Sequence, residues 1–255
     1  MAQSLDELAS TWRGWLVSGE SRAGHEVLAE ALLASSVPSR ARAICLYADG
    51  LFLFRLGEQR ASRERNEEAL AVARQVGDRE AESLALVGLS RVAFREGRHD
   101  EVVELATRAR ELAAGVGSQA EVAPLHMQAA GTRLLRDYDR AAELYRESME
   151  LARRLGNKRG VAMEQHNLAH VELHRGNFEE AARLFSARLE FARASADPYE
   201  HAMTALNQAA LAAAQQDHEL ARQRISEARR LLDEHRIVLD PDDASEFDSL
   251  AARYS

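Results

Sequence analysis

The sequence repeats itself with a period of 39 or 40 residues. Twenty residues separate two columns of turn residues within each period. A period of this length is typical of a solenoid, in which each unit packs against its neighbours. The first column consists of Gly57, Gly97, Arg136, Gly176 and Gln216, and the second of Gly77, Gly117, Gly156 and Ala196.

Each unit is expected to contain two helices. In residues 79–118, apolar side chains recur at helical spacing up to Gly97, and a second apolar stripe ends at Gly117. Asp100 is a candidate cap for the second of these helices. Because the whole sequence contains only four prolines and its helical stretches are joined by tight turns, it predicts an all-α fold.

Small residues recur at two further positions of the period, seven residues before the turn column and five residues after it. Small side chains are needed where two helices approach closely, so we expect contacts between helices at both positions. The first set is Gly50, Ser90, Ala129, Ala169 and Ala209, and the second is Ser62, Val102, Ala141, Ala181 and Ala221.

The composition narrows the class of protein. A net charge of −8 argues against a general binder of nucleic acid or of membrane surfaces. The single cysteine, Cys45, is consistent with a reducing compartment. No signal peptide is recognisable, and no apolar run approaches the ~20 residues that span a bilayer. We therefore expect a cytoplasmic protein.

These columns resemble the tetratricopeptide repeat. The best local matches are Asn167–Ala169 followed by Gly176–Ala181. The segment Leu151–Asn157 is similar to the ending of the 40-residue variety found in bacterial signalling and transcriptional regulators. The resemblance covers nearly the whole chain and implies a right-handed superhelical solenoid. The departures from the family pattern are Arg136 and Gln216 at the turn glycine and Arg188 at the late alanine of the second helix.

The repeats predict one domain. The first repeat is the weakest, because Trp12 takes its small-residue position; a large residue is less surprising in a terminal repeat with one unpaired face. Asp240 and Pro241 are typical of a helix start, which predicts a C-terminal capping helix. The expected repeats are about 1–38, 39–78, 79–118, 119–157, 158–197 and 198–236, with the capping helix at 241–254.

The sequence contains no recognisable catalytic motif. It lacks a glycine-rich phosphate loop, a nucleophile elbow and paired cysteines for a metal. In the segment 170–174 the acidic residue Glu172 comes one residue too late after His170 for a zinc-protease helix. Most acidic residues are expected on solvated helix faces. We therefore expect no enzymatic activity, no cofactor and no bound metal.

The resemblance implies that the first helices of the repeats line a concave groove that binds a partner. The candidate binding residues, obtained mainly by counting back from the turn column, are Arg13, Tyr47, Leu51, Phe54, Arg55, Val87, Arg91, Phe94, Arg95, His126, Arg133, His166, Asn167, His170, His174 and Asn207. Ala210 is likewise expected to face the groove.

Half of this groove is apolar and rich in arginine, in a protein whose net charge is −8. Arginine is suited to bidentate contacts with carboxylates, which predicts an acidic amphipathic peptide or protein segment as the partner. The alternative is that these arginines pair with glutamates of adjacent helices and that Phe54 and Phe94 are ordinary core residues.

The other half contains a histidine stripe. His166, His170 and His174 are four residues apart on one helix, and His126 holds the position of His166 one repeat earlier. The three span about 12 Å along the helix axis, so one ion cannot bind them all. The stripe remains open to ligand recognition, to a weak two-histidine metal site, or to simple solvation.

The sequence predicts a non-catalytic binding scaffold or regulatory adaptor. The competing class is a sensor that binds a small ligand or metal near the histidines. A third is an enzyme that uses Arg and His without a local motif. Self-association is left open by the sequence.

Overall fold

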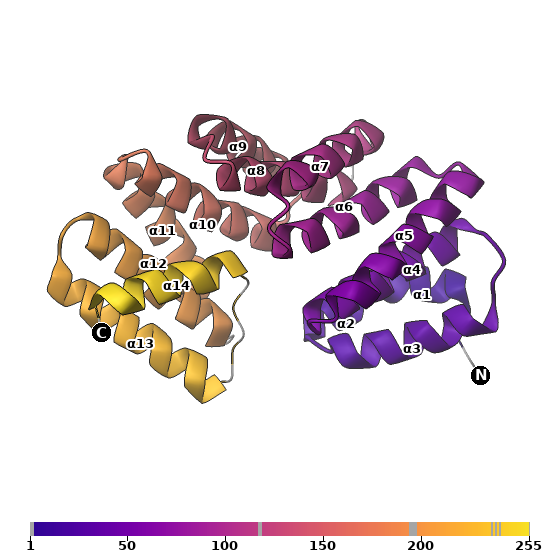
Figure 1. Cartoon of the computed structure of the whole chain (residues 1–255), viewed down its shortest axis with the longest axis horizontal. Helices are drawn as coiled ribbons and strands as arrows, with labels where there is room; N and C mark the ends of the chain where they lie inside the picture. Colours follow the sequence, from indigo (N-terminus) through magenta and orange to yellow (C-terminus); the bar gives the residue numbers. More distant parts are fainter. Residues whose placement is uncertain are drawn as a thin grey trace. The chain divides into compact units, whose positions relative to one another are not determined.

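The computed structural model describes residues 3–116, 119–193, 198–235, 237, 239 and 241–254. Within these ranges the chain forms helices, turns and loops and no strand, which confirms the expected all-α class. In order, the α-helices are α1 (Leu5–Thr11), α2 (Arg13–Ser18), α3 (Ser21–Ala34), α4 (Arg40–Arg55), α5 (Gln59–Val76), α6 (Arg79–Arg95), α7 (His99–Ala113), α8 (Val122–Leu134), α9 (Tyr138–Arg154), α10 (Lys158–His174), α11 (Phe178–Arg193), α12 (Pro198–Ala214), α13 (His218–His235) and α14 (Pro241–Tyr254), with a short 3-10 turn, η1 (Gln119–Glu121), before α8 (Figure 1).

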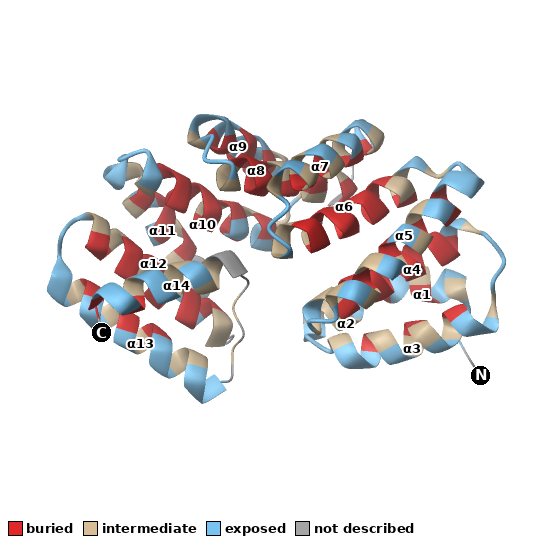
Figure 2. Ribbon diagram, viewed as in Figure 1, coloured by how far each residue is buried: buried red, intermediate tan, exposed pale blue. Residues whose placement is uncertain are grey.

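Two compact units divide the chain, Met1–Leu135 and Arg136–Ser255, here called unit 1 and unit 2. In unit 1, helix α4 is buried from Ala41 to Leu53, because α1, α3, α5 and α6 all pack against it (Figure 2). In unit 2, α10 packs against α9 and α11, and α12 packs against α13. Among the described residues, no helix combines the length and the apolar character that crossing a bilayer requires.

The turn column has one backbone conformation throughout. Gly57, Gly97 and Gly176 have φ angles of 85°, 71° and 77°, in the left-handed region. Arg136 and Gln216, the two departures from glycine, adopt the same region, at 64° and 63°. The helix end at Gln216 is closed by the same backbone bond as at the glycines, from the Gln216 N–H to the Ala213 carbonyl. The turn geometry of the repeat is therefore retained where the glycine is lost.

The two small-residue columns lie in the core. Ala169 and Ala209 of the first column and Ala181 of the second are 0% exposed. In unit 1 the two columns meet, because the Ser62 hydroxyl donates to the carbonyl oxygen of Gly50 at 2.8 Å. These residues are small because two helix backbones approach each other there.

Trp12 differs from its expected setting. It ends α1 and begins α2, so the expected first helix of this repeat is two helices. Its side chain is only 2% exposed and makes edge-to-face contacts with Tyr47 and Phe52 of α4, at centroid distances of 5.8 and 6.3 Å. The large residue is thus accommodated by burial against the next repeat.

Several local expectations differ from the structure or lie outside it. Helix α7 begins at His99 with Arg98 as its cap, so Asp100 lies in the first turn and is not the cap residue. A carboxylate in the first turn still interacts favourably with the helix dipole. Gly117 and Ala196 of the second turn column, and the expected cap residue Asp240, lie outside the described residues.

Some charged residues of unit 2 are buried, contrary to the general expectation of solvated faces. Arg188, at the late-alanine position, is 5% exposed and donates to Glu200 at 2.7 Å. Glu172 is 0% exposed and accepts hydrogen bonds from Arg175 and Asn177. Buried charges need such partners, so these groups have a structural role in unit 2.

Candidate functional site

Arg91 of α6 is held against α4. Its Nη1 donates to the Tyr47 hydroxyl at 3.1 Å, and Tyr47 in turn contacts the edge of Trp12. The guanidinium is partly exposed, whereas Tyr47 is 3% exposed. Tyr47 therefore holds the Arg91 side chain through this hydrogen bond and exposes little surface of its own to a partner.

Arg95 lies one turn further along α6 and is held by the end of α4. Its Cζ atom is 3.8 Å from the centroid of the Phe54 ring, and its Nη1 donates to the Phe54 carbonyl oxygen at 2.8 Å. Stacking on an aromatic face together with a hydrogen bond restricts a side chain that is otherwise flexible. The structure thus brings Phe54, Arg91 and Arg95 together on neighbouring helices.

The remaining predicted residues of unit 1 divide by burial. Leu51 and Val87 are 8% and 0% exposed and belong to the core. Arg13 is exposed, with its Cζ 4.5 Å from the Trp12 ring centroid. Arg55 is exposed at the end of α4, and partly exposed residues of α6 and α8 complete the set: Phe94, His126 and Arg133. We call Arg13, Phe54, Arg55, Arg91, Phe94, Arg95 and Arg133 the arginine–aromatic surface.

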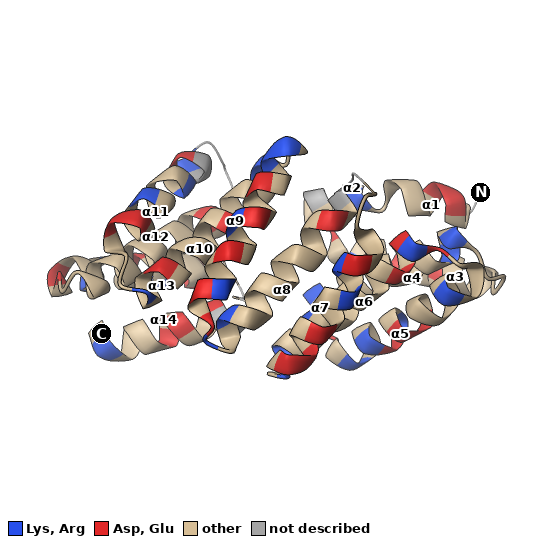
Figure 3. Cartoon of the chain, turned by 90° about the horizontal axis from the view of Figure 1, so that it is seen from above, with Lys and Arg blue, Asp and Glu red and all other residues tan. Residues whose placement is uncertain are grey.

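Two carboxylates of unit 1, Glu96 and Asp49, are held by basic residues outside this surface. Glu96 accepts from Arg63 at 2.8 Å, and the buried Asp49 accepts from Arg65 at 2.8 Å. Figure 3 shows acidic and basic residues interspersed along the helices of each unit. The predicted groove positions of unit 1 contain no carboxylate of their own.

The histidines of α10 are covered in unit 2. His166 and His170 are 6% and 3% exposed. The His170 Nε2 contacts the Asn207 Oδ1 of α12 at 3.1 Å, and its Nδ1 contacts the Glu246 Oε2 of α14 at 2.9 Å. The His166 Nε2 contacts the Asp243 Oδ1 of α14 at 3.2 Å. Both ring nitrogens of His170 are thus engaged, and α14 lies over this face of α10.

The other predicted residues of unit 2 are placed differently. His174 is exposed, and its ring stacks on Tyr138 at a centroid distance of 4.7 Å. Asn167 is 8% exposed and donates to the Met163 carbonyl oxygen, as a core side chain does. His126 belongs to unit 1, so a common patch of His126 with the α10 histidines remains a prediction.

Metal binding gains no support from the described part of the chain. Among those residues, no three His, Cys, Asp or Glu side chains come together in a way that would hold an ion. The rings of His166 and His170 lie edge to face, 4.6 Å apart, and their neighbours are the carboxylates of α14.

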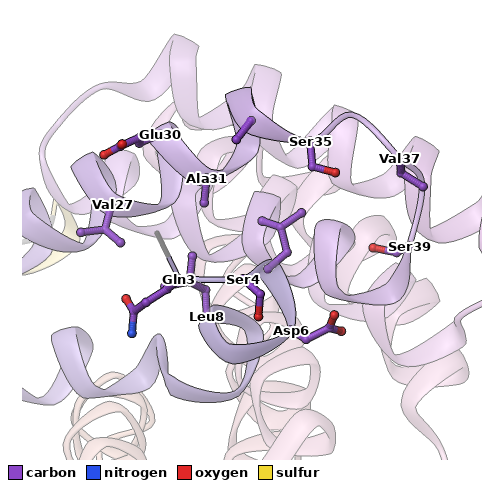
Figure 4. Close-up of a pocket in the computed structure, with 12 residues that line it drawn as sticks. Gln3, Ser4, Asp6, Leu8, Val27, Glu30, Ala31, Ser35, Val37 and Ser39 are labelled. Carbon is purple, nitrogen blue, oxygen red and sulfur yellow. The ribbon is translucent and has the colours of Figure 1, made fainter. Parts of the chain in front are cut away.

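Two features were missed by the sequence analysis. The carboxylates of α14 that contact the histidines were visible in the sequence as an acidic i, i+3 pair, but nothing linked them to α10. The second is a pocket of about 510 Å³ beside α1 and α3 (Figure 4). Leu8, Val27 and Ala31 give it an apolar side, and Asp6 and Glu30 lie at its edge. No motif marks these residues in the sequence.

Comparisons with known proteins identify the fold. No protein-family model and no curated protein matches the chain. A Rap protein in complex with Competence and Sporulation Factor matches 95% of this chain and 68% of its own, with a TM-score of 0.74 and 13% identity. NprR in complex with its cognate peptide NprX matches 98% of this chain and 73% of its own, with a TM-score of 0.72 and 16% identity. TPR-like repeats of a Podosopora anserina protein match 73% of this chain and 93% of their own, with a TM-score of 0.55 and 17% identity. The chain therefore has the helical repeat fold of the tetratricopeptide-type proteins.

Proposed function

We propose that this protein is a non-catalytic peptide-binding adaptor that acts in regulation in the cytoplasm, as one repeat domain. Its ligand is an acidic amphipathic segment of a protein, which binds the arginine–aromatic surface of unit 1. The observation that carries this proposal is the pair Arg91 and Arg95, which present guanidinium groups from successive turns of α6 and are held by Tyr47 and by Phe54.

The chemistry of this surface matches a carboxylate-bearing helix or strand. A guanidinium group has a planar fork of N–H donors that forms paired hydrogen bonds with a carboxylate. Because Arg95 is already fixed on Phe54, less rotamer entropy is lost when a ligand binds. Phe54 and Phe94 are partly exposed and supply apolar contact beside the charges.

The fold supports a binding function. Two proteins with similar folds have structures with a bound partner: Rap with Competence and Sporulation Factor, and NprR with its cognate peptide NprX. At 13% and 16% identity this likeness concerns the fold alone, so the choice of ligand rests on the residues of this chain.

Charge reversal tests the proposal. In Arg91→Glu/Arg95→Glu, binding of a fluorescein-labelled helical peptide with glutamates on one face and Leu and Phe on the other should weaken at least about tenfold. The matched control is Arg22→Glu/Arg108→Glu, which makes the same charge change at exposed positions of α3 and α7. Fluorescence anisotropy measures both affinities, and melting curves verify that both variants fold.

Salt and ligand charge provide a second readout. Affinity for the acidic peptide should fall between 0.1 M and 1 M salt, where the Debye length shrinks from ~10 Å to ~3 Å. A peptide with glutamine in place of glutamate should bind weakly at either salt concentration. Equal binding by the charge-reversed variant and by the control would refute the proposal.

A further inference from the structure

Helix α14 of unit 2 has partners on α10, α12 and α13. Its Asp243 and Glu246 contact His166 and His170 of α10 at 3.2 and 2.9 Å. Its other partners belong to α12 and α13. The resemblance to tetratricopeptide repeats places the first helices of the repeats, which include α10 and α12, along the ligand-binding side. The C-terminal helix therefore lies on the face that such a protein would offer to a ligand.

The apolar side of α14 has the spacing of a helix bound in a groove. Phe247, Leu250, Ala251 and Tyr254 follow the i, i+3, i+4, i+7 pattern. Ala251 and Tyr254 are 7% and 4% exposed, and Phe247 and Leu250 are partly buried against the core of α12 and α13. The sequence of α14 contains four acidic residues and one arginine. This is an acidic amphipathic helix, the ligand class proposed for the arginine–aromatic surface.

The contacts of α14 are few for a structural element. The adjacent pair of helices, α12 and α13, packs together far more extensively than either does with α14. Two of the four apolar residues on its inner side, Phe247 and Leu250, remain partly exposed. A helix attached in this way is held partly by its covalent tether, which raises its local concentration at the site.

We propose that the face of α10 and α12 around His166, His170 and Asn207 is a docking site for an acidic amphipathic helix of a partner protein, and that α14 is its built-in occupant. A partner helix with carboxylates three residues apart, followed by an i, i+3, i+4, i+7 apolar stripe, displaces α14. This inference deepens the proposed function and rests on it for the ligand class, but it concerns a different surface, in unit 2.

The proposal has a quantitative consequence. While α14 occupies the site, the apparent dissociation constant for an external helix equals the intrinsic constant divided by the fraction of molecules in which α14 is released. Weakening the contacts of α14 must therefore tighten binding of an external helix. If α14 were only a structural cap, weakening its contacts would leave the affinity for an external helix unchanged or reduce it. Its release would then expose core residues without creating a specific binding site.

The probe is a fluorescein-labelled peptide with the sequence of residues 241–255, titrated against full-length chains by fluorescence anisotropy. The opened variant is Glu246→Gln/Phe247→Ala, which removes one histidine contact and one apolar anchor. The matched control is Asp248→Asn/Ser249→Ala, which makes the same charge change on the exposed side of α14. We expect the opened variant to bind the peptide about tenfold more tightly than the wild type, and the control to bind like the wild type.

The peptide itself carries a second test. A peptide with Glu246→Gln should bind the opened chain several-fold more weakly than the unmodified peptide, whereas one with Asp248→Asn should bind equally well. Because the proposed function gives the arginine–aromatic surface affinity for the same class of peptide, the titrations are repeated with Arg91→Glu/Arg95→Glu in the unopened, opened and control chains. In this background the opened chain should still bind the peptide about tenfold more tightly than the unopened chain. If the gain on opening is absent there, the peptide occupies unit 1, and the present inference fails while the proposed function stands.

Displacement can be measured without opening the chain, should the opened variant prove unfolded by circular dichroism. Ala252 is exposed on α14, so Ala252→Cys accepts an environment-sensitive fluorophore, while the buried Cys45 does not react. Saturating peptide should change the emission as α14 leaves. An unchanged emission at saturation would overturn the proposal. Sedimentation provides a further check. If the chain forms a dimer that no longer binds the peptide, the α14 helix of a second copy occupies the site, and the proposal of a partner protein fails.

Discussion

At the scale of single residues, the two residues that replace glycine in the turn column keep the backbone conformation of glycine. Arg136 and Gln216 adopt φ angles of 64° and 63°, where a side chain is strained and glycine is not. At Gln216 the backbone bonds that close the helix end are the same as at the glycines of the column. The repeat therefore retains its turn at some cost in stability.

Replacing Gln216 by glycine should stabilise the protein. The left-handed conformation is free of steric penalty for glycine, so we expect a gain of about 1 kcal/mol in the free energy of unfolding. Gln223→Gly, the same substitution at an exposed interior position of α13, should instead lose about 1 kcal/mol. Urea denaturation measures both changes. A loss at Gln216 would contradict the strain argument.

The single thiol illustrates how burial sets reactivity. Burial, and then the negative charges of Asp6 and Asp49, raise the pKa of Cys45 to about 12. The folded chain therefore holds the neutral thiol, and the stability that this contributes is present below pH 9 and is lost as the pH rises from 9 to about 12. Iodoacetamide at pH 8 should leave the native protein unmodified but alkylate it fully in urea, as measured by mass spectrometry. Rapid native alkylation would show that this part of the core opens readily.

At the scale of helices, close approach decides which positions accept only small residues. Asn66 of α5 lies so close to α4 and α6 that a β-carbon at Gly50 or Gly88 would be 2.5 or 1.8 Å from its side chain. In unit 2, Ala169 of α10 is the repeat equivalent of Gly50, and Ala181 of α11 is the equivalent of Ser62; both are 0% exposed. Such contacts fix the spacing of helices within each unit.

Enlarging a residue at such a contact should destabilise the fold. Ala169→Leu should cost about 1–3 kcal/mol, because the added atoms have no space between α10 and its neighbour. Ala210, expected from the sequence to face the groove, is 5% exposed, so Ala210→Leu should destabilise as well. Ala71→Leu, at an exposed position of α5, is the neutral control. Thermal denaturation tests the set, and equal melting temperatures for Ala169→Leu and Ala71→Leu would contradict the packing argument.

At the scale of the whole molecule, net charge and local charge act differently. A net charge of −8 repels acidic ligands at long range, so recognition of such a ligand has to come from a local cationic surface. We propose that Arg91 and Arg95 provide that surface in unit 1. In unit 2 the neighbours of Asp243 and Glu246 are the buried side chains of His166 and His170.

Much of the fold could be predicted from the sequence. The all-α class, the positions of the turns and the small residues at helix contacts all follow from a pattern that recurs every 39 or 40 residues. The candidate site was predicted less completely. Counting along the helices selected Arg91 and Arg95, but it also selected core residues such as Val87. The reason is that the side of a helix that lines a groove is adjacent to the side that packs against the next repeat.

The repeat pattern alone predicts the features that depend on neighbours along the chain or one repeat away: helix and turn positions and the residues that must be small. What covers the histidines depends instead on tertiary packing. His166 and Asp243 are 77 residues apart, and α14 stands outside the periodic pattern, so no column predicts where it packs. Periodicity determines contacts between equivalent repeats, whereas the position of a unique terminal helix depends on the shape and charge of the surface that the repeats have already built.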